Sequence, residues 1–179
     1  MDAAERDGTL GGVSSPTAGA TAAQLTATEL RAWRAISESS QLLGAILDRK
    51  LKDGLGLSHA DYGVLRRLQE AEGNELSMRA LRHEVWFSRS RLTHQVNRLV
   101  AAGFLKKFSD VSDGRLQVVA LTPVGVDLVI RAQQIVRQSL HEHFFEQLPP
   151  ASENRLAVLL SGLVEHLREQ PECQAFRNS

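Results

Sequence analysis

The sequence predicts a mainly α-helical chain with one small β-hairpin, an α+β fold class in which helices dominate. Three observations support this prediction. Apolar residues recur at three- and four-residue spacing along most of the chain, residues 77–102 have the pattern of helix, short turn and helix, and residues 104–121 hold two strand-like runs around a polar tip. With 179 residues and 42% hydrophobic side chains, the chain can bury the core of one ordinary domain.

The two ends of the chain differ from the middle in composition. Residues 1–24 are rich in Gly, Ala, Ser and Thr and hold almost no large apolar side chains, so they are expected to form a disordered tail. Residues 171–179 are expected to form a C-terminal tail. A single domain is expected between these tails, over about residues 25–170.

The first helix is expected over about residues 26–53, where apolar side chains form a stripe at helical spacing before Gly54 and Gly56 end the helix. That stripe includes Leu30, Trp33, Ile36, Leu43, Leu47 and Leu51. Ser58 and Asp61 then have the form of a capping box, which opens a second helix. The predicted buried face of this helix comprises Tyr62, Leu65 and Leu68.

Two further helices, joined by a tight turn, are expected next. Ser77 can cap the first, and Ser88 can cap the second, which runs to about Ala102. Helical spacing gives the second helix an inward and an outward face. The inward positions are Leu92, Val96, Leu99 and Gly103. The outward positions are Ser90, His94, Asn97, Arg98 and Ala101, flanked by Arg91.

A hairpin and two helices complete the expected fold. Strands are expected at roughly Leu105–Phe108 and Leu116–Leu121, and Thr122–Pro123 has the residue types of a helix cap and a first helical position. A long helix should then run to about Gln147. The last helix, about Ser152–Arg168, carries a uniformly aliphatic stripe that needs a partner surface. The apolar faces of the first and last helices are consistent with a subunit interface or with a monomer core, and the sequence leaves both open.

The charged residues are unevenly distributed. Lys plus Arg (21) equals Asp plus Glu (21), so the net charge gives no indication of an acidic partner. Between residues 79 and 107, however, Glu84 is the single acidic residue, and every other charged residue is basic. The basic residues there are Arg79, Arg82, Arg89, Arg91, Arg98, Lys106 and Lys107.

This basic segment favours DNA binding. The second helix of a helix-turn-helix can enter the major groove, where Arg reads guanine and Asn or His offers further contacts. The basic side chains of a lone helix are more often simply exposed to solvent than bound to DNA. Here the helix-turn-helix arrangement and the hairpin directly after it favour DNA binding instead. A hairpin tip that carries Arg115 can place its guanidinium group in a flanking minor groove, with Asp113 orienting it. Lys106 and Lys107 are placed to meet phosphates.

Over about residues 25–168, the chain resembles the MarR family of winged-helix transcriptional regulators. The most specific match is "DGRLQVVALTPVG", which carries the family's D-x-R and L-T-x-x-G patterns. These patterns fall on Asp113, Arg115, Leu121, Thr122 and Gly125. The segments "GLSHADYGVLRRL" (56–68), "SRSRLTHQVNRLVAAGFL" (88–105) and "FFEQLPPASENRLAVLL" (144–160) also resemble members of the family.

The resemblance implies a homodimer formed by helices at about 26–53 and 122–168, with winged helix-turn-helix lobes at about 57–121. It also implies binding to a pseudo-palindromic operator in double-stranded DNA, usually as a repressor, and release by a small ligand that is often phenolic or otherwise lipophilic. The DNA contacts predicted from the resemblance and the charge pattern together are Ser88, Arg89, Ser90, Arg91, Thr93, His94, Asn97, Arg98, Lys106, Lys107, Asp113 and Arg115.

A ligand pocket is expected between the dimerisation helices and the lobe. Trp33, Arg34 and Ser37 on the first helix could line it together with His59 and Tyr62 on the second. Arg34 would then pair with the carboxylate of an aromatic acid. Plain core or dimer contacts are the more common role for Trp33 and Tyr62, and this alternative stays open.

Other sites and classes are not expected. The lone cysteine, Cys173, allows no internal disulfide, fits a reducing cytoplasm, and lies far from the N-terminal position of the family's peroxide-sensing thiols. His141 and His143 are two residues apart on a helix and should point apart, so no metal site is expected. The apolar runs are too short to span a membrane, and the N-terminus lacks a secretion signal, so a cytoplasmic protein without a membrane partner is expected.

The sequence also argues against an enzyme and against a cofactor. No nucleophile with a base, carboxylate pair or phosphate loop has the required spacing, and "GLGLS" lacks the lysine of a P-loop. Two alternatives to a sequence-specific regulator remain: a helical protein-interaction module with an acidic partner, and a non-specific DNA-binding protein. The salt dependence of binding and the comparison of different duplexes distinguish them.

Overall fold

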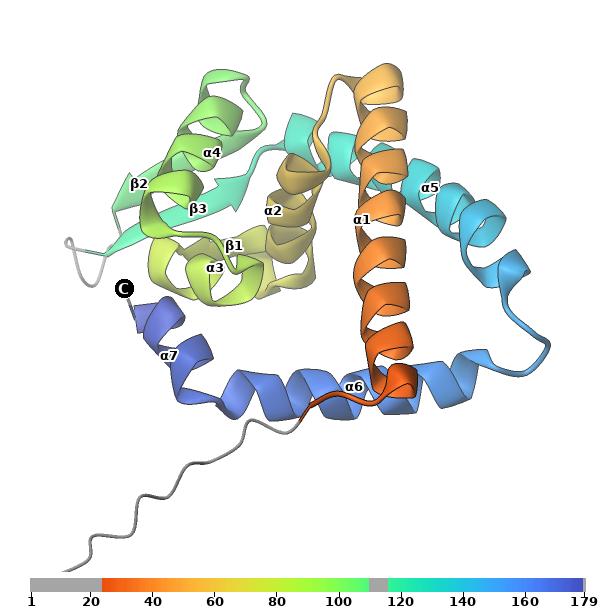
Figure 1. Cartoon of the computed structure of the whole chain (residues 1–179). Helices are drawn as coiled ribbons and strands as arrows, with labels where there is room; N and C mark the ends of the chain where they lie inside the picture. Colours follow the sequence, from red (N-terminus) through yellow and green to blue (C-terminus); the bar gives the residue numbers. More distant parts are fainter. Residues whose placement is uncertain (1–23, 110–115, 179) are drawn as a thin grey trace, which may run out of the picture. The chain divides into compact units, whose positions relative to one another are not determined.

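The computed structural model describes residues 24–109 and 116–178 (Figure 1). All but the last residue of the expected disordered tail, and Asp113 and Arg115 at the hairpin tip, lie outside the described residues. The chain divides into two units within its first helix, one up to Ile36 and one from Ser37 onward. The core and the candidate site described below belong to the second unit.

The described residues form helices and one small antiparallel sheet. The α-helices are α1 (Ala27–Leu55), α2 (His59–Glu70), α3 (Met78–Val85), α4 (Arg89–Ala101), α5 (Pro123–His143), α6 (Glu153–Glu169) and α7 (Pro171–Asn178). Short 3-10 turns occupy Glu72–Asn74 and Phe145–Gln147. The strands are β1 (Glu75–Ser77), β2 (Leu105–Ser109) and β3 (Gln117–Leu121), in the spatial order β1-β3-β2. The mainly helical α+β class predicted from the sequence is therefore confirmed.

The helix starts follow the capping residues that the sequence indicates. The Ser58 hydroxyl accepts a hydrogen bond from the Asp61 amide at 3.1 Å, and the Asp61 carboxylate accepts one from the Ser58 amide at 3.1 Å, which completes the capping box of α2. The hydroxyl groups of Ser77, Ser88 and Thr122 cap α3, α4 and α5, each by accepting a hydrogen bond from a backbone amide of the first turn. These caps supply acceptors for amide groups that have no partner inside the helix.

The L-T-x-x-G pattern joins the end of α4 to the start of α5. The Thr122 hydroxyl donates to the Gly103 carbonyl oxygen at 2.8 Å, and it also accepts from the Gly125 amide at 3.0 Å. A β-carbon at Gly125 would lie 2.1 Å from the carbonyl oxygen of Phe104, so only glycine fits this approach. The chain after α4 is thereby held against the first turn of α5.

The core of the second unit collects the predicted apolar faces of several helices and one strand. Its fully buried side chains include Leu51, Leu65, Leu68, Leu81, Leu92, Val96, Val119 and Val129. Each such burial contributes roughly 1.5–3 kcal/mol. They come from the C-terminal half of α1, from α2 to α5 and from β3, so the core holds α4 against the rest of the lobe.

Three differences from the sequence prediction are found. The three-residue strand β1, which pairs Leu76 with Val119 on β3, was not expected. The long helix α5 ends at His143, and residues up to Gln147 form a 3-10 turn instead of continuing it. The expected C-terminal tail contains α7.

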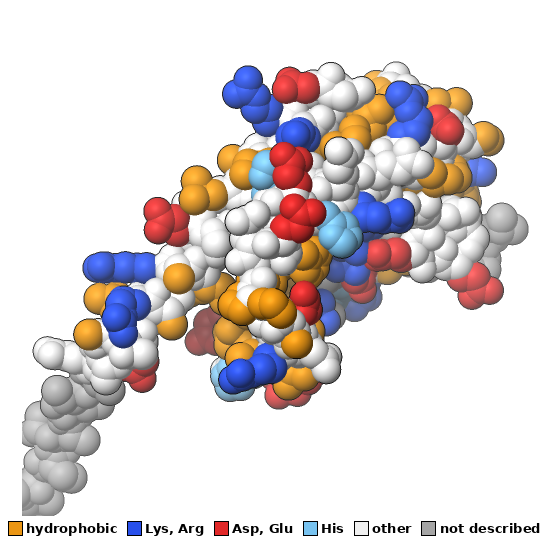
Figure 2. Space-filling view, turned by 90° about the vertical axis from the view of Figure 1, so that its right-hand side faces the viewer, with side chains coloured by type: hydrophobic (Ala, Val, Ile, Leu, Met, Phe, Trp, Pro, Cys, Tyr) orange, Lys and Arg blue, Asp and Glu red, His pale blue; other side chains and the backbone are white. Residues whose placement is uncertain are grey.

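Large apolar side chains remain exposed on α1, α5 and α6. Within the described part of the chain, α6 buries none of its residues, and the side chains of Val158 and Leu159 are 69% and 70% exposed. Trp33 in α1 is 62% exposed. Hydrophobic side chains open to solvent are visible in the space-filling view (Figure 2). The buried residues of α1 are confined to Leu47 and Leu51 near its C-terminal end.

Candidate nucleic-acid interface

The outward face of α4 forms an open groove of about 780 Å³. Six of the predicted DNA contacts line it: Ser88, Arg89, Ser90, Thr93, His94 and Asn97. All but Thr93, which is half-buried, are exposed. The Thr93 hydroxyl donates to the Arg89 carbonyl oxygen at 2.8 Å, a bond within the helix itself. The structure thus brings these six residues together on one accessible polar surface.

The turn before α4 orients the start of that helix. Trp86 ends α3 in the left-handed conformation, with φ of 53°, which few residues other than glycine adopt. The Ser88 hydroxyl then accepts from the Arg91 amide at 3.4 Å. The Arg91 guanidinium lies 4.3 Å from the centre of the Phe87 ring, a cation–π contact that restrains its direction. Arg91 therefore points away from the groove of α4 and toward the side of α2, where it lines a separate hollow.

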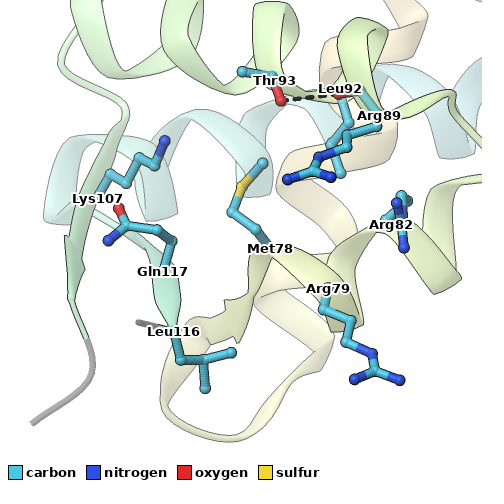
Figure 3. A pocket seen from close by; sticks show the side chains of 9 residues that line it. All are labelled: Met78, Arg79, Arg82, Arg89, Leu92, Thr93, Lys107, Leu116 and Gln117. Atoms are coloured by element: carbon cyan, nitrogen blue, oxygen red, sulfur yellow. Dashed lines mark hydrogen bonds between the residues drawn. The ribbon is translucent and has the colours of Figure 1, made fainter. Parts of the chain in front are cut away.

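A second basic hollow, of about 490 Å³, lies between α3, α4 and the strands (Figure 3). Its lining residues are Met78, Arg79, Arg82, Arg89, Leu92, Thr93, Lys107, Leu116 and Gln117. Four of these side chains are cationic and none carries a carboxylate. The Nε atom of Arg82 is buried and has no hydrogen-bond partner among the described residues. Such a concentration of cations suits the phosphate oxygens of a nucleic-acid backbone.

Arg79 and Arg82 were counted in the basic segment but were given no role by the sequence reasoning. Their spacing of three residues on α3 places them on neighbouring parts of one helix face. This spacing was sufficient to predict that the two arginines share one face of the helix. Their convergence with Lys107 depends on how the hairpin packs beside α3 and α4, which the sequence does not give.

Lys106 and Lys107 lie on opposite faces of strand β2. Successive residues of a strand point to opposite faces of the sheet. Lys107 lines the basic hollow beside α4, whereas the Lys106 ammonium lies 5.5 Å from the centre of the Phe108 ring on the other face of β2. Of the two predicted phosphate contacts on this strand, only Lys107 lies beside α4 in this hollow.

Arg98 has an internal partner. Its Nη2 atom donates to the carboxylate of Asp61, which is 1% exposed, and the Nε2 atom of Gln95 donates to the same carboxylate oxygen. The Arg98 side chain is still 51% exposed. The sequence placed Arg98 on the outward face and gave Gln95 no role, whereas the structure ties both to the core of the lobe.

The predicted ligand-pocket residues are only partly brought together. The rings of His59 and Tyr62 stack with their centres 6.4 Å apart, and Tyr62 is a core residue that is 7% exposed. Burial lowers the pKa of His59 and raises the pKa of Tyr62. Trp33 and Arg34 are exposed and belong to the first unit, and Ser37 accepts a hydrogen bond from the Gln41 amide group at 3.4 Å within α1.

His59 also lines a hollow of about 340 Å³ beside Arg91. Its other lining residues are Ala60, Gly63, Arg66, Arg67, Glu84, Val85 and Phe87. Arg67 forms an ion pair with Glu84 at 3.6 Å. Part of the positive charge that lines this hollow is therefore neutralised by another residue of the hollow itself. This hollow contains none of the four other residues predicted for the ligand pocket.

Neither a metal cluster nor a membrane-spanning helix is found among the described residues. Within residues 24–109 and 116–178, no group of three or more His, Cys, Asp and Glu side chains is placed to hold a metal ion. No helix in this part of the chain is both long and apolar enough to cross a membrane.

Known structures closely match this fold. Sco3205 of Streptomyces coelicolor, a MarR family transcriptional regulator solved in complex with DNA, is 31% identical, with 84% of this chain and 93% of that chain covered at a TM-score of 0.77. AbsC, a MarR family transcriptional regulator of the same organism, is 33% identical, with coverage of 83% and 99% and a TM-score of 0.77.

A more distant match shares the fold. BpsR of Bordetella bronchiseptica, whose DNA binding is regulated by 6-hydroxynicotinic acid, is 22% identical, with 79% of this chain and 98% of that chain covered at a TM-score of 0.68. No family model matches the sequence, and no curated protein sequence does. The matching structures named here include a regulator bound to DNA and one whose DNA binding responds to a small molecule.

Proposed function

The chain belongs to the MarR family of transcriptional regulators, and on that premise we propose that it is a homodimeric repressor of a pseudo-palindromic operator. The observation that carries the proposal is the groove of α4, where Arg89, His94 and Asn97 project from one accessible helix face. These side chains supply the donors and acceptors that read base edges in a major groove. Sco3205, which is 31% identical, was solved in complex with DNA.

The proposed interface uses three kinds of contact. Base edges are read from the groove of α4, phosphates are met by Lys107 and by Arg79 and Arg82 of the basic hollow, and the wing enters a flanking minor groove. The full set of proposed DNA contacts remains Ser88, Arg89, Ser90, Arg91, Thr93, His94, Asn97, Arg98, Lys106, Lys107, Asp113 and Arg115, extended by Arg79 and Arg82.

Dimerisation is supported by the exposed apolar side chains of α1 and α6. Val158, Leu159 and Trp33 are each more than 60% exposed in the single chain, and covering such surface by a second copy is favourable by roughly 25 cal/mol per Å². We assign residues 26–53 and 122–168 to the dimerisation helices and residues 57–121 to the lobe. In the dimer, the two α4 helices must lie about 34 Å apart to enter successive major grooves on one face of the duplex.

We also propose that a small ligand releases the protein from DNA. A ligand that binds better to a dimer with misplaced α4 helices would shift the population away from DNA, with a coupling of typically about 1–3 kcal/mol. BpsR, which shares the fold, is regulated by an aromatic acid, 6-hydroxynicotinic acid. We propose a phenolic or related aromatic effector for this protein, with Trp33, Arg34, Ser37, His59 and Tyr62 as candidate contacts. The site of action is the cytoplasm, where such a regulator meets its DNA.

Fluorescence anisotropy tests the proposal. Purified protein is titrated onto duplexes from the region upstream of its own gene and onto scrambled duplexes, each at two salt concentrations. The proposal predicts tight, salt-sensitive binding that is stronger for an upstream duplex by a factor of about 10³ or more. Equal affinity for all duplexes would support a non-specific DNA-binding protein. Absence of salt-sensitive binding would favour a protein-interaction module.

A further inference from the structure

The carboxylate of Asp61 joins two helices that are far apart in the sequence. One oxygen accepts hydrogen bonds from the Ser58 amide at 3.1 Å and the Ser58 hydroxyl at 2.6 Å, at the start of α2. The other accepts from Gln95 and Arg98 of α4. Asp61 is 1% exposed, so this charge is stabilised by these donors and not by water.

The two donors on α4 fix the rotation of that helix. Gln95 and Arg98 are three residues apart, about one helical turn, so the carboxylate holds α4 at two levels of the same face. Turning α4 about its axis would carry both donors away from this one carboxylate oxygen. His94 and Asn97 each directly precede one of these donors and lie on the groove side of α4, so the rotation of the helix sets their direction.

The same corner is tied to α1. The amide of His59, the first residue of α2, donates to the carboxylate of Asp48 at 2.9 Å. Lys52 forms an ion pair with the other oxygen of Asp48 at 2.6 Å. A continuous series of polar contacts therefore runs from the C-terminal half of α1, through Asp48 and the start of α2, to the middle of α4.

We propose that Asp61 is a positioning residue for DNA recognition: it sets the rotation of α4 and transmits displacements of α1 to the side chains in the groove. This inference rests on the proposed function, because it concerns how the base-reading face is aimed. Since α1 is also a proposed dimerisation helix, a change at the dimer interface would reach α4 through Asp48 and Asp61.

The first test compares Asp61→Asn with Asp127→Asn. The control removes a carboxylate from an exposed ion pair with Arg131 at 3.8 Å on α5. Asp61→Asn should weaken binding to the upstream duplex about tenfold or more while changing binding to the scrambled duplex less than about twofold, with the salt slope unchanged because the phosphate contacts remain. Asp61→Glu, which retains the charge and the capping box, should recover part of the selectivity.

Loss of stability without loss of selectivity would overturn the proposal and make Asp61 a purely structural residue. A parallel loss of affinity for both duplexes would also overturn it, because a misaimed helix should lose base readout before phosphate binding. Asp127→Asn should leave both affinities unchanged.

The second test is hydrogen exchange without DNA, which separates this inference from the proposed function. Asp61→Asn should raise deuterium uptake in the peptide covering α4 and leave the peptides of β3 and α5 unchanged. Asp48→Asn, at a half-exposed site, should produce a smaller rise in the same α4 peptide. Unchanged uptake in α4 for both variants would overturn the inference, even if the protein selects its operator. If the wild-type protein bound no operator selectively, the proposed function would be refuted, whatever the deuterium uptake of α4 in the variants.

Discussion

Two exposed surfaces of the molecule, the outward face of α4 and the stripe of α6, have opposite chemistry. The face of α4 presents Arg89, His94 and Asn97 around an open groove. The stripe of α6 presents aliphatic side chains such as Val158 and Leu159, which are 69% and 70% exposed. Polar donors lose little by facing water, whereas a row of exposed aliphatic groups favours association. Exposure alone therefore does not identify a partner, and the chemistry of the exposed groups does.

The two helices also differ in how they are held. The inward face of α4 buries Leu92, Val96 and Leu99, and Asp61 binds its polar side, so this chain alone positions the helix. Within the described residues, no side chain of α6 is fully buried. We infer that α4 is preformed for DNA, whereas α6 gains its surroundings from a second copy. Mutations in and around the two helices test this difference.

A charge on the apolar stripe of α6 should have the largest effect. Leu163→Glu would place a carboxylate in the proposed interface, where its desolvation is unfavourable. The variant should be monomeric by light scattering, and its affinity for the upstream duplex should fall about 100-fold or more because two linked half-sites become one. Glu165→Gln, a change at an exposed polar position of the same helix, should leave the dimer intact. A dimeric Leu163→Glu protein would remove α6 from the interface.

A side chain at Gly125 should disturb the joint that holds the end of α4. The added β-carbon of Gly125→Ala would meet the Phe104 carbonyl oxygen at 2.1 Å, so the backbone must move. The free energy of unfolding should fall by roughly 1–3 kcal/mol in denaturant titrations. Gly63→Ala in α2, where a β-carbon meets nothing within 4 Å, should leave stability unchanged or raise it by up to about 1 kcal/mol. Equal effects of the two changes would contradict the structure of this joint.

Mutations of a base contact and of a phosphate contact should have different effects on DNA binding. Asn97→Ala should reduce the preference for the upstream duplex by roughly tenfold, since one good base contact gives about 1–3 kcal/mol of discrimination. Lys107→Ala should weaken binding to all duplexes alike and lower the salt slope by about 1. Anisotropy titrations at several salt concentrations measure both quantities. If Asn97→Ala weakened both duplexes in parallel, Asn97 would be a phosphate contact.

Protonation of His59 should have the smallest effect. Burial lowers its pKa below the ordinary value of 6.5, so the unfolded chain binds the proton more readily than the folded chain does. Stability should therefore be constant above about pH 6.5 and decrease as the pH falls below it. Thermal unfolding between pH 7.5 and 5 should show a shallower decrease for His59→Gln than for the wild type. His166→Gln, at an exposed position of α6, should follow the wild type.

Local features of the fold could be predicted from the sequence. The caps at Ser58, Ser77, Ser88 and Thr122 lie where the residue types indicate, because a cap depends on neighbours only a few residues away. The apolar spacing of α4 likewise indicated its buried face. The strand β1 could not be predicted, because three residues carry no clear alternation and their pairing depends on β3.

Tertiary contacts in the candidate site could be predicted only in part. The sequence identified Asp61 as a capping residue, whereas its bonds to Gln95 and Arg98 join residues 34 and 37 positions away. The groove residues of α4 share one helix face, so their spacing was sufficient to group them. The basic hollow gathers Arg79, Arg82 and Lys107 from two elements, and only the packing of the hairpin brings them together.

We infer that α4 meets DNA while α6 meets a second copy, and measuring the mass of the protein–DNA complex distinguishes this arrangement from binding by a single chain. Multi-angle light scattering of the protein mixed with an upstream duplex gives the number of 19.7 kDa chains bound to each duplex. We expect two chains in the free protein and two chains on one duplex, with no such complex on a scrambled duplex at the same salt concentration. A single chain that binds the upstream duplex selectively would contradict it.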